Sequence, residues 1–127
     1  MPGMDRVFIT IGALSGFLAV AAGAFGAHAL RDRLSTDMLG VFQTGATYQM
    51  YHALALVGVG ILLARFSVDG SALVSAAGWL FVAGTLLFSG SLYALSLSNT
   101  TWLGAITPIG GIAFLLGWLA LAVGIWR

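Results

Sequence analysis

The sequence predicts an all-α fold, an integral membrane bundle of four transmembrane helices. Of the 127 residues, 60% are hydrophobic and 7% are charged, whereas about 25% of the residues in a typical soluble domain are charged. The mean hydropathy is +1.03. The apolar residues fall into four segments, each of the roughly 20 residues needed to cross about 30 Å of hydrocarbon. Because lipid cannot satisfy backbone polar groups, we expect each segment to be a helix.

The first segment covers about residues 7 to 30 and ends at the charged stretch Arg31-Asp32-Arg33. It resembles a secretory signal in one respect, since Ala27-His28-Ala29 has the pattern of a cleavage site. Its apolar run is longer than the about 7–15 residues of a signal core, however. We therefore expect it to be retained as the first transmembrane helix.

The second helix is expected over about residues 36 to 64. Ser35 offers an N-cap hydroxyl and Asp37 places an acid in the first turn, which is typical of a helix start. The apolar residues of the stretch 38 to 42 have helical spacing, so these first turns are expected to lie in the membrane interface. The helix ends near Arg65, and Ser67-Val68-Asp69-Gly70 has the composition of a turn.

The third helix is expected over about residues 72 to 95, followed by a polar, uncharged loop over residues 96 to 101. The fourth covers about residues 107 to 126. Its start is indicated by Thr107 as a capping hydroxyl and by Pro108 in the first turn, where the missing N–H of proline costs nothing. By length, residues 1–127 form a single transmembrane domain.

Four crossings place both termini on one side of the membrane. That side carries Arg6, Arg65 and Arg127, and the other side carries Arg31 and Arg33. Since positive charge is enriched on the cytoplasmic side, this distribution favours cytoplasmic termini. The expected location is a bacterial inner (plasma) membrane.

Small residues recur every three or four positions along the first and fourth helices. Small side chains let helix backbones approach closely in lipid, so these stripes predict tight packing within the bundle. The alternative is that one stripe forms a homo-oligomer interface. The glycines assigned to helix packing are Gly12, Gly16, Gly23, Gly110, Gly117 and Gly124.

Polar residues inside the second and third segments predict an interior polar site. Gly45, Tyr48, Gln49 and His52 fall within an arc of about 100° at about 100° per residue. On the third helix, Ser89 and Tyr93 share a face with Ser96. The candidate ligand-binding or interior polar residues are Tyr48, Gln49, His52, Ser89, Tyr93 and His28.

His52 permits two interpretations. Ionisable residues within a membrane span usually point into a bundle or cavity and serve a function, such as proton relay or ligand, metal or haem binding. The structural alternative is a neutral imidazole hydrogen-bonded to Gln49, Tyr93 or a backbone carbonyl. His28 lies beside Arg31 at a helix end, a position more typical of an interfacial residue than of a ligand.

Composition excludes several classes of function. There is no cysteine, so disulfides and thiolate chemistry are absent. Two histidines and four aspartates outside the spans are a poor ligand set, so we expect no metal and no cofactor. No basic run indicates nucleic-acid binding. With no carboxylate inside a span, an ion-driven transporter acting as a monomer is not favoured.

Four blocks of sequence resemble the YgdD/YwdK-like family of small membrane proteins. They are Gly23-Ala24-Phe25-Gly26-Ala27-His28-Ala29-Leu30, the stretch from Thr44-Gly45 through Tyr48-Gln49-Met50-Tyr51-His52-Ala53-Leu54, Phe88-Ser89-Gly90-Ser91-Leu92-Tyr93, and Thr107-Pro108-Ile109-Gly110-Gly111. The resemblance covers nearly the whole chain. It implies a four-helix membrane protein of unknown function, with relatives in bacteria and eukaryotes, and it implies no catalytic residues.

The expected function is therefore that of a non-enzymatic protein of the lipid bilayer. It would bind a small apolar or amphipathic ligand, or a protein partner, through the interior polar face. The alternative is a small oligomeric transporter or channel component with His52 on a proton or solute path. An enzyme or a haem carrier comes third.

Overall fold

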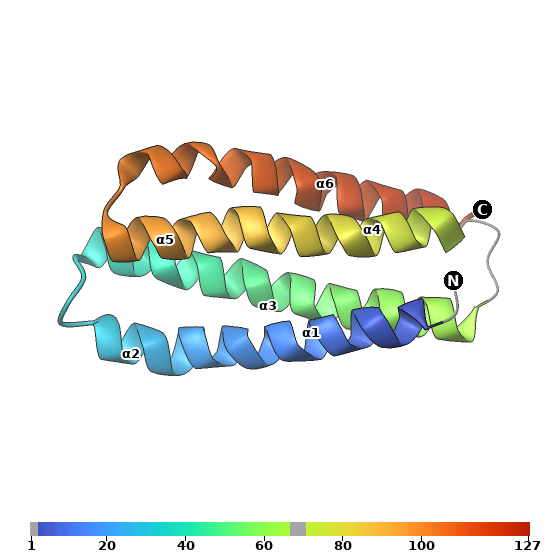
Figure 1. Ribbon diagram of the computed structural model, residues 1–127, viewed down its shortest axis with the longest axis horizontal. Coiled ribbons are helices and arrows are strands. Elements are labelled where there is room, and N and C mark those ends of the chain that lie inside the picture. Colours follow the sequence, from blue (N-terminus) through green and yellow to red (C-terminus); the bar gives the residue numbers. More distant parts are fainter. Residues whose placement is uncertain (1–2, 67–70) are drawn as a thin grey trace.

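The computed structural model describes residues 3–66 and 71–127. Four helical spans run side by side along the long axis of the molecule (Figure 1), and in the described part of the chain no residue is in a strand. The all-α membrane bundle is confirmed. The turn expected at Ser67–Gly70 lies outside the described residues. The spans are Met4–Leu30, Thr36–Arg65, Ser71–Ser98 and Thr101–Gly124.

The first and third spans each contain a short π-helical segment. Such a segment inserts one extra residue into a helix and shifts the faces that follow it. The first span consists of α1 (Met4–Val20), η1 (Ala21–Gly26) and α2 (Ala27–Leu30). The third consists of α4 (Ser71–Gly84), η2 (Thr85–Ser89) and α5 (Gly90–Ser98). The segment η1 contains Gly23 and Gly26, whereas η2 contains neither glycine nor proline.

The second span is one continuous helix, α3 (Thr36–Arg65), of 30 residues. The Ser35 hydroxyl accepts a hydrogen bond from the Met38 N–H at 3.2 Å, which confirms Ser35 as the N-cap. At about 1.5 Å per residue the helix is about 45 Å long and exceeds the hydrocarbon thickness. Its midpoint lies near residue 50.

The fourth span begins with a 3-10 turn, η3 (Thr101–Ala105), and continues as α6 (Thr107–Gly124). The expectation that Thr107 caps this helix is wrong. Ile106 is the capping residue, and its hydrocarbon side chain forms no cap bond. The Thr107 hydroxyl instead pairs with the Ser91 hydroxyl of α5 at 2.6 Å. The hydroxyl thus joins two helices rather than starting one.

The bundle consists of two closely packed helix pairs. In the described residues the most extensive helix contacts are those of α1 with α3 and of α4 with α6, and α3 also contacts α4 and α5. Gly12 allows the first pair to approach, since a Cβ atom there would lie 2.7 Å from the Ala53 carbonyl oxygen. Gly117 and Gly110 do the same for the second pair. A Cβ at Gly117 would lie 2.7 Å from the Phe81 ring, and one at Gly110 would overlap backbone atoms of the facing helix.

The other glycines of the stripes lie in less crowded surroundings. A Cβ at Gly16 would be 3.8 Å and one at Gly23 would be 3.6 Å from the nearest side chain, which is ordinary van der Waals contact. At Gly124 the nearest atom would be 3.0 Å away, in Val74. The stripe on α1 therefore has one crowded position, Gly12, rather than three.

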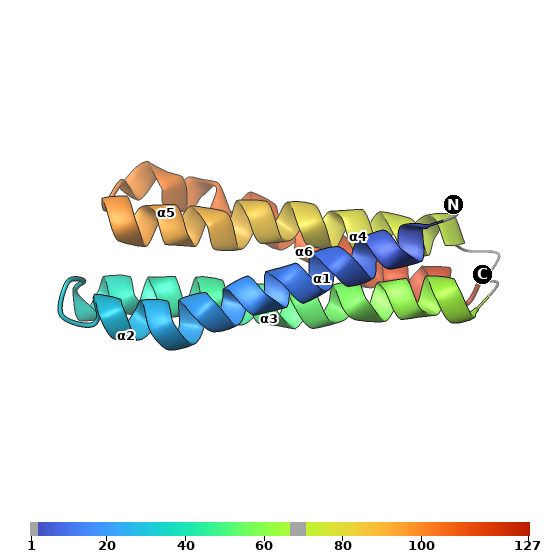
Figure 2. The ribbon, with the colours of Figure 1, turned by 60° about the horizontal axis from the view of Figure 1, so that its bottom comes forward.

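The hydrophobic core lies toward the end of the bundle where α1 begins. It consists of Phe8, Leu56, Val59, Val74, Ala77, Phe81 and Phe114. Phe8 of α1 is fully buried and packs edge-on against Trp79 of α4, with ring centroids 5.1 Å apart. From this contact α1 diverges from α4 toward the other end of the molecule (Figure 2).

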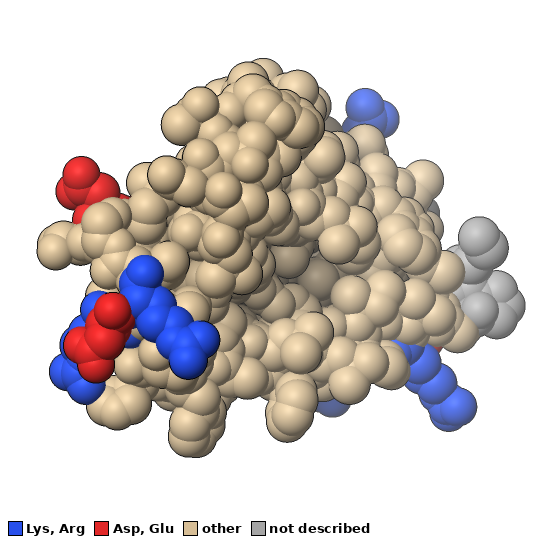
Figure 3. All heavy atoms as spheres, turned by 60° about the vertical axis from the view of Figure 1, so that its left-hand side comes forward, with Lys and Arg blue, Asp and Glu red and all other residues tan. Residues whose placement is uncertain are grey.

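The first residues of α1 and the last residues of α6 lie at the same end of the bundle (Figure 1). Charged side chains gather at the ends of the molecule, and the visible sides between them are uncharged and partly hollowed (Figure 3). Trp102 and Trp126, near the two ends of the fourth span, are 65% and 90% exposed. This distribution of charge suits a protein whose sides contact lipid.

Candidate functional site

Gln49 is the centre of a hydrogen-bond network that joins three helices. Its amide nitrogen donates to the Ser15 carbonyl oxygen at 3.0 Å and to the Ser15 hydroxyl at 3.3 Å. Its amide oxygen accepts from the Tyr93 hydroxyl at 2.6 Å. Both ends of the buried amide are therefore paired, which fixes its orientation. Because the partners lie on α1 and α5, the network joins the pair of α1 and α3 to the third span.

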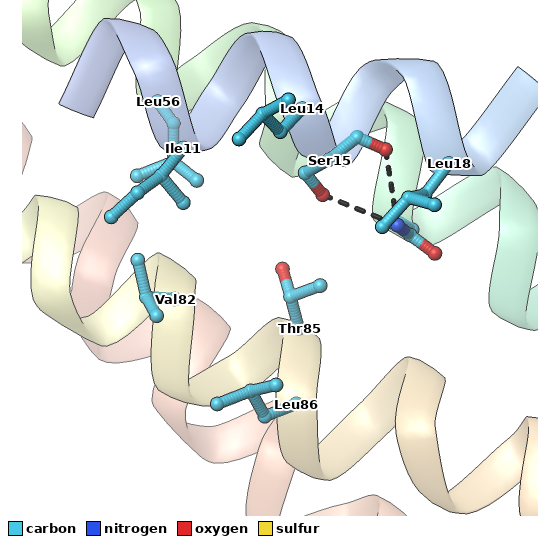
Figure 4. A pocket seen from close by; sticks show the side chains of 9 residues that line it. Ile11, Leu14, Ser15, Leu18, Leu56, Val82, Thr85 and Leu86 are labelled. Atoms are coloured by element: carbon cyan, nitrogen blue, oxygen red, sulfur yellow. Dashed lines mark hydrogen bonds between the residues drawn. The ribbon is translucent and has the colours of Figure 1, made fainter. Parts of the chain in front are cut away.

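A groove opens beside this network, between α1 and the third span. Its volume is about 270 Å³, close to the lower limit of about 300 Å³ typical of ligand pockets. Ile11, Leu14, Ser15 and Leu18 form one wall and Val82, Thr85 and Leu86 the other (Figure 4), with Gln49 and Leu56 of α3 completing the lining. The rim is lipid-exposed, since Leu14 is 60% and Leu86 is 71% exposed.

The π segment η2 places two hydroxyl groups on different sides of the third span. The Gly90 N–H bonds to the Thr85 carbonyl oxygen, five residues back, which closes the wide turn. Ser89, at the end of η2, is buried and donates to the Gly45 carbonyl oxygen of α3 at 2.7 Å. Thr85, at the start of η2, points into the groove (Figure 4). The groove thus lies next to an irregular turn of the kind often found at functional sites.

His52 lies on the other side of α3, against α6. Its Nδ1 is 2.7 Å from the Tyr48 carbonyl oxygen, and its Nε2 is 3.1 Å from the Trp118 indole nitrogen. A carbonyl only accepts and an indole N–H only donates, so Nδ1 carries the hydrogen and Nε2 accepts. The imidazole ring also stacks on Phe114, with centroids 3.5 Å apart. This is a neutral, fully paired histidine.

The candidate residues predicted from the sequence do not form one continuous site. The structure brings Gln49, Tyr93 and Ser89 together at the interface of α3 with the third span. His52 belongs to the separate contact with α6. The arc that contains both residues is about 100° wide, so its two edges face different neighbours.

Tyr48 and His28 lie outside the polar interior. Tyr48 is 39% exposed, because it occupies the edge of the polar arc of α3, and its ring packs against Phe88. His28 is exposed at the end of the first span, where its Nδ1 lies 3.1 Å from Nη2 of Arg31. The assignment of His28 to the interior is therefore wrong. It lies one turn from the helix end, where charged neighbours meet water.

Sequence analysis missed three residues that take part in these contacts. Ser15 and Thr85 are hydroxyl residues within apolar spans, where back-bonding to the helix is the ordinary expectation. Trp118 is an aromatic residue inside an apolar span, where packing against neighbouring helices or lipid is the ordinary expectation. Their position along the helical spans could have identified Ser15 and Thr85, because both lie in the same middle layer of the bundle as Gln49.

No group of three or more histidine or acidic side chains that could hold a metal ion occurs in the described residues. The Gln49 network is neutral and the groove lining contains no charged residue. Chemically, the site offers hydrogen bonds and apolar surface.

Comparison with known proteins places the chain among small membrane proteins. A family model described as "Protein of unknown function (DUF423)" matches residues 22–111. The chain is 50% identical over 118 residues to the UPF0382 membrane protein YwdK of Bacillus subtilis, covering 93% of this chain and 94% of that protein. It is 47% identical over 122 residues to a UPF0382 membrane protein of Staphylococcus saprophyticus, covering 96% and 98%.

No solved structure matches the chain. The match to the family model covers more than half of the residues, and the relatives align along almost their full length. These proteins are named as membrane proteins, in agreement with four helices long and apolar enough to cross a bilayer. The resemblance noted from the four sequence blocks is confirmed, and the chain belongs to the DUF423 family of membrane proteins, whose function is unknown.

Proposed function

We propose that this protein is a non-enzymatic membrane protein that binds a small apolar or amphipathic ligand in the groove between α1 and the third span. The observation that carries the proposal is the groove itself. Its walls are apolar, its rim is formed by exposed leucines, and the hydroxyl groups of Ser15 and Thr85 converge on it. Pockets that are mostly apolar with a few convergent polar groups are the usual form of small-ligand sites.

A ligand dissolved in the bilayer would reach the groove without crossing a helix interface. The exposed leucines Leu14, Leu18 and Leu86 form its rim, and α1 diverges from α4 along the length of the molecule (Figure 2). The arginine distribution favours an orientation with both termini on the cytoplasmic side of a bacterial inner membrane. The ligand would then enter from the hydrocarbon and not from either aqueous side.

The transport alternative depends on His52, and the hydrogen bonds of that residue do not favour it. A proton relay needs an imidazole nitrogen free to exchange its proton with a neighbour. Both ring nitrogens of His52 are paired within the bundle, with a carbonyl and with an indole N–H. Protonation of His52 would place a hydrogen on Nε2, opposite the indole N–H of Trp118, so that two donors would face each other.

Photolabelling in nanodiscs tests the proposal. The probe is a long-chain alcohol that carries a diazirine at mid-chain, and labelled residues are located by peptide mass spectrometry. We expect labelling concentrated on Leu14, Leu18 and Leu86 and their neighbours. Leu86→Trp, which fills the groove, should reduce this labelling several-fold.

The matched control is Leu119→Trp on α6, since Leu119 is a comparably lipid-exposed leucine at 63% exposure and does not line the groove. It should leave the labelling of the groove unchanged. Labelling spread evenly over all lipid-facing leucines, with no effect of Leu86→Trp, would refute binding in the groove.

A further inference from the structure

The polar atoms of the groove lie near the midpoints of their helical spans, which we take as the middle of the membrane. Thr85 is one of the two central residues of the span Ser71–Ser98, and Gln49 adjoins the central pair of Thr36–Arg65. Ser15 is two residues from the centre of Met4–Leu30. At about 1.5 Å per residue, all three lie within about 3 Å of the midpoint of their helices. The charged end of a phospholipid or fatty acid lies about 15 Å away, at the edge of the hydrocarbon.

The groove carries no charge that could compensate a charged ligand group. Its nine lining residues are apolar or neutral, and the arginines and described aspartates lie at the ends of the molecule (Figure 3). A charged group at the bilayer centre is costly unless it is paired. The polar part of a ligand in this groove must therefore be neutral.

Two hydrogen-bonding positions remain open on opposite walls. The Ser15 hydroxyl accepts from Gln49, and among the described residues its own hydrogen has no acceptor. The Thr85 hydroxyl donates to the Phe81 carbonyl oxygen at 2.8 Å, so its lone pairs are left to accept. Both side chains point into the same cavity (Figure 4). The groove thus offers one donor and one acceptor.

We propose that the ligand is an uncharged, membrane-soluble alcohol whose hydroxyl group lies at the bilayer centre, accepting from Ser15 and donating to Thr85. This inference rests on the proposed function and names the ligand class of the same groove. A hydroxyl is the smallest neutral group that both donates and accepts. A ketone would satisfy only Ser15, and a hydrocarbon would satisfy neither residue.

Three probes of matched shape test this assignment in nanodiscs: dioctylmethanol, dioctyl ketone and heptadecane. Each competes with the photoreactive alcohol for labelling of the groove. We expect dioctylmethanol to compete best, the ketone about fivefold less well and heptadecane about fivefold less well again, since one net hydrogen bond changes affinity by about that factor.

Two isosteric variants assign the bonds. Ser15→Ala should weaken competition by the alcohol and by the ketone about fivefold, and Thr85→Val should weaken only the alcohol. Thr44→Val is the matched control. Its hydroxyl makes the same back-bond, to Gly40 at 2.9 Å, on an exposed face, and its loss should change none of the three affinities.

Several results would overturn the assignment while leaving the groove as a binding site. Equal competition by all three probes would show that no hydrogen bond contributes. Equal competition by the alcohol and the ketone would show that Thr85 accepts no hydrogen bond from the ligand. Stronger competition by oleate than by the alcohol would contradict a neutral ligand. Even labelling of all faces, unaffected by Leu86→Trp, would instead remove the proposed function itself.

Discussion

Gly12→Ala should destabilise the bundle, whereas Gly16→Ala, one turn further along the same helix, should not. A Cβ at Gly12 would lie 2.7 Å from the Ala53 carbonyl oxygen and 3.0 Å from the Val57 amide nitrogen. These are backbone atoms of α3 and cannot move aside by a side-chain rotation. At Gly16 the nearest atom would be the Ala53 Cβ at 3.8 Å, a favourable contact distance. Both changes add one methyl group against the same residue.

The magnitude follows from two opposing terms. Replacing glycine by alanine in a helix gains up to about 1 kcal/mol from backbone propensity, and overpacking costs about 1–3 kcal/mol. The propensity term is shared by both variants and cancels when they are compared. Gly12→Ala should therefore be less stable than Gly16→Ala by about 1–3 kcal/mol, and Gly16→Ala should equal or exceed the wild type.

The assay is reversible unfolding in mixed micelles by titration with sodium dodecyl sulfate, followed by circular dichroism and tryptophan fluorescence. The wild type and both variants are compared at equal micelle composition. If the two variants differ by less than about 0.5 kcal/mol, the ordinary spread of neutral substitutions, then α1 and α3 are not held at the spacing that Gly12 sets.

Two further predictions concern the contacts of α6. Trp118→Phe should cost about 0.6 kcal/mol, the average measured for hydrogen bonds between membrane helices, and at most about 1.7 kcal/mol. It should also shift the ¹⁵N resonance of His52 Nε2, which loses its donor; an unchanged resonance would contradict the assigned tautomer. Gly110→Ala should destabilise the bundle in the same micelle titration, because a Cβ atom there would meet backbone atoms of the facing helix. Gly111→Ala should be neutral, because the nearest neighbour of its Cβ would be 3.9 Å away. Equal stability of the two variants would argue against close packing at Gly110.

The four spans were predictable because they depend on composition and on local signals. Ser35 caps α3 as its position predicts, since the hydroxyl and the Met38 N–H are only three residues apart. Thr107 has a similar local signal, yet its hydroxyl bonds to Ser91 across the bundle. Nothing local distinguishes these two cases, because the choice depends on whether a second polar group lies within reach after the helices have packed.

Geometry explains why the sequence could not predict that the polar residues of α3 divide between two helix contacts. An arc of about 100° on one helix is wide enough to face two neighbours, and periodicity does not say which neighbour each edge meets. Gln49 meets Ser15 and Tyr93, and His52 meets Trp118. The π segments add to this, since the extra residue in η2 changes which side chains of the third span share a face.

These contacts move the functional hypothesis from His52 to the groove. A polar side chain whose bonds are all made inside the bundle can hold helices together, but it has nothing left to offer a ligand, and both His52 and Gln49 are paired in this way. Ser15 and Thr85 keep an open donor and an open acceptor, at a seam where two tightly packed helix pairs separate. If the groove served packing alone, a leucine at either position would fill it and stabilise the bundle, because apolar packing is cheaper than an open hydroxyl in lipid. These two hydroxyl groups are the reason why we propose a neutral ligand that enters from the membrane.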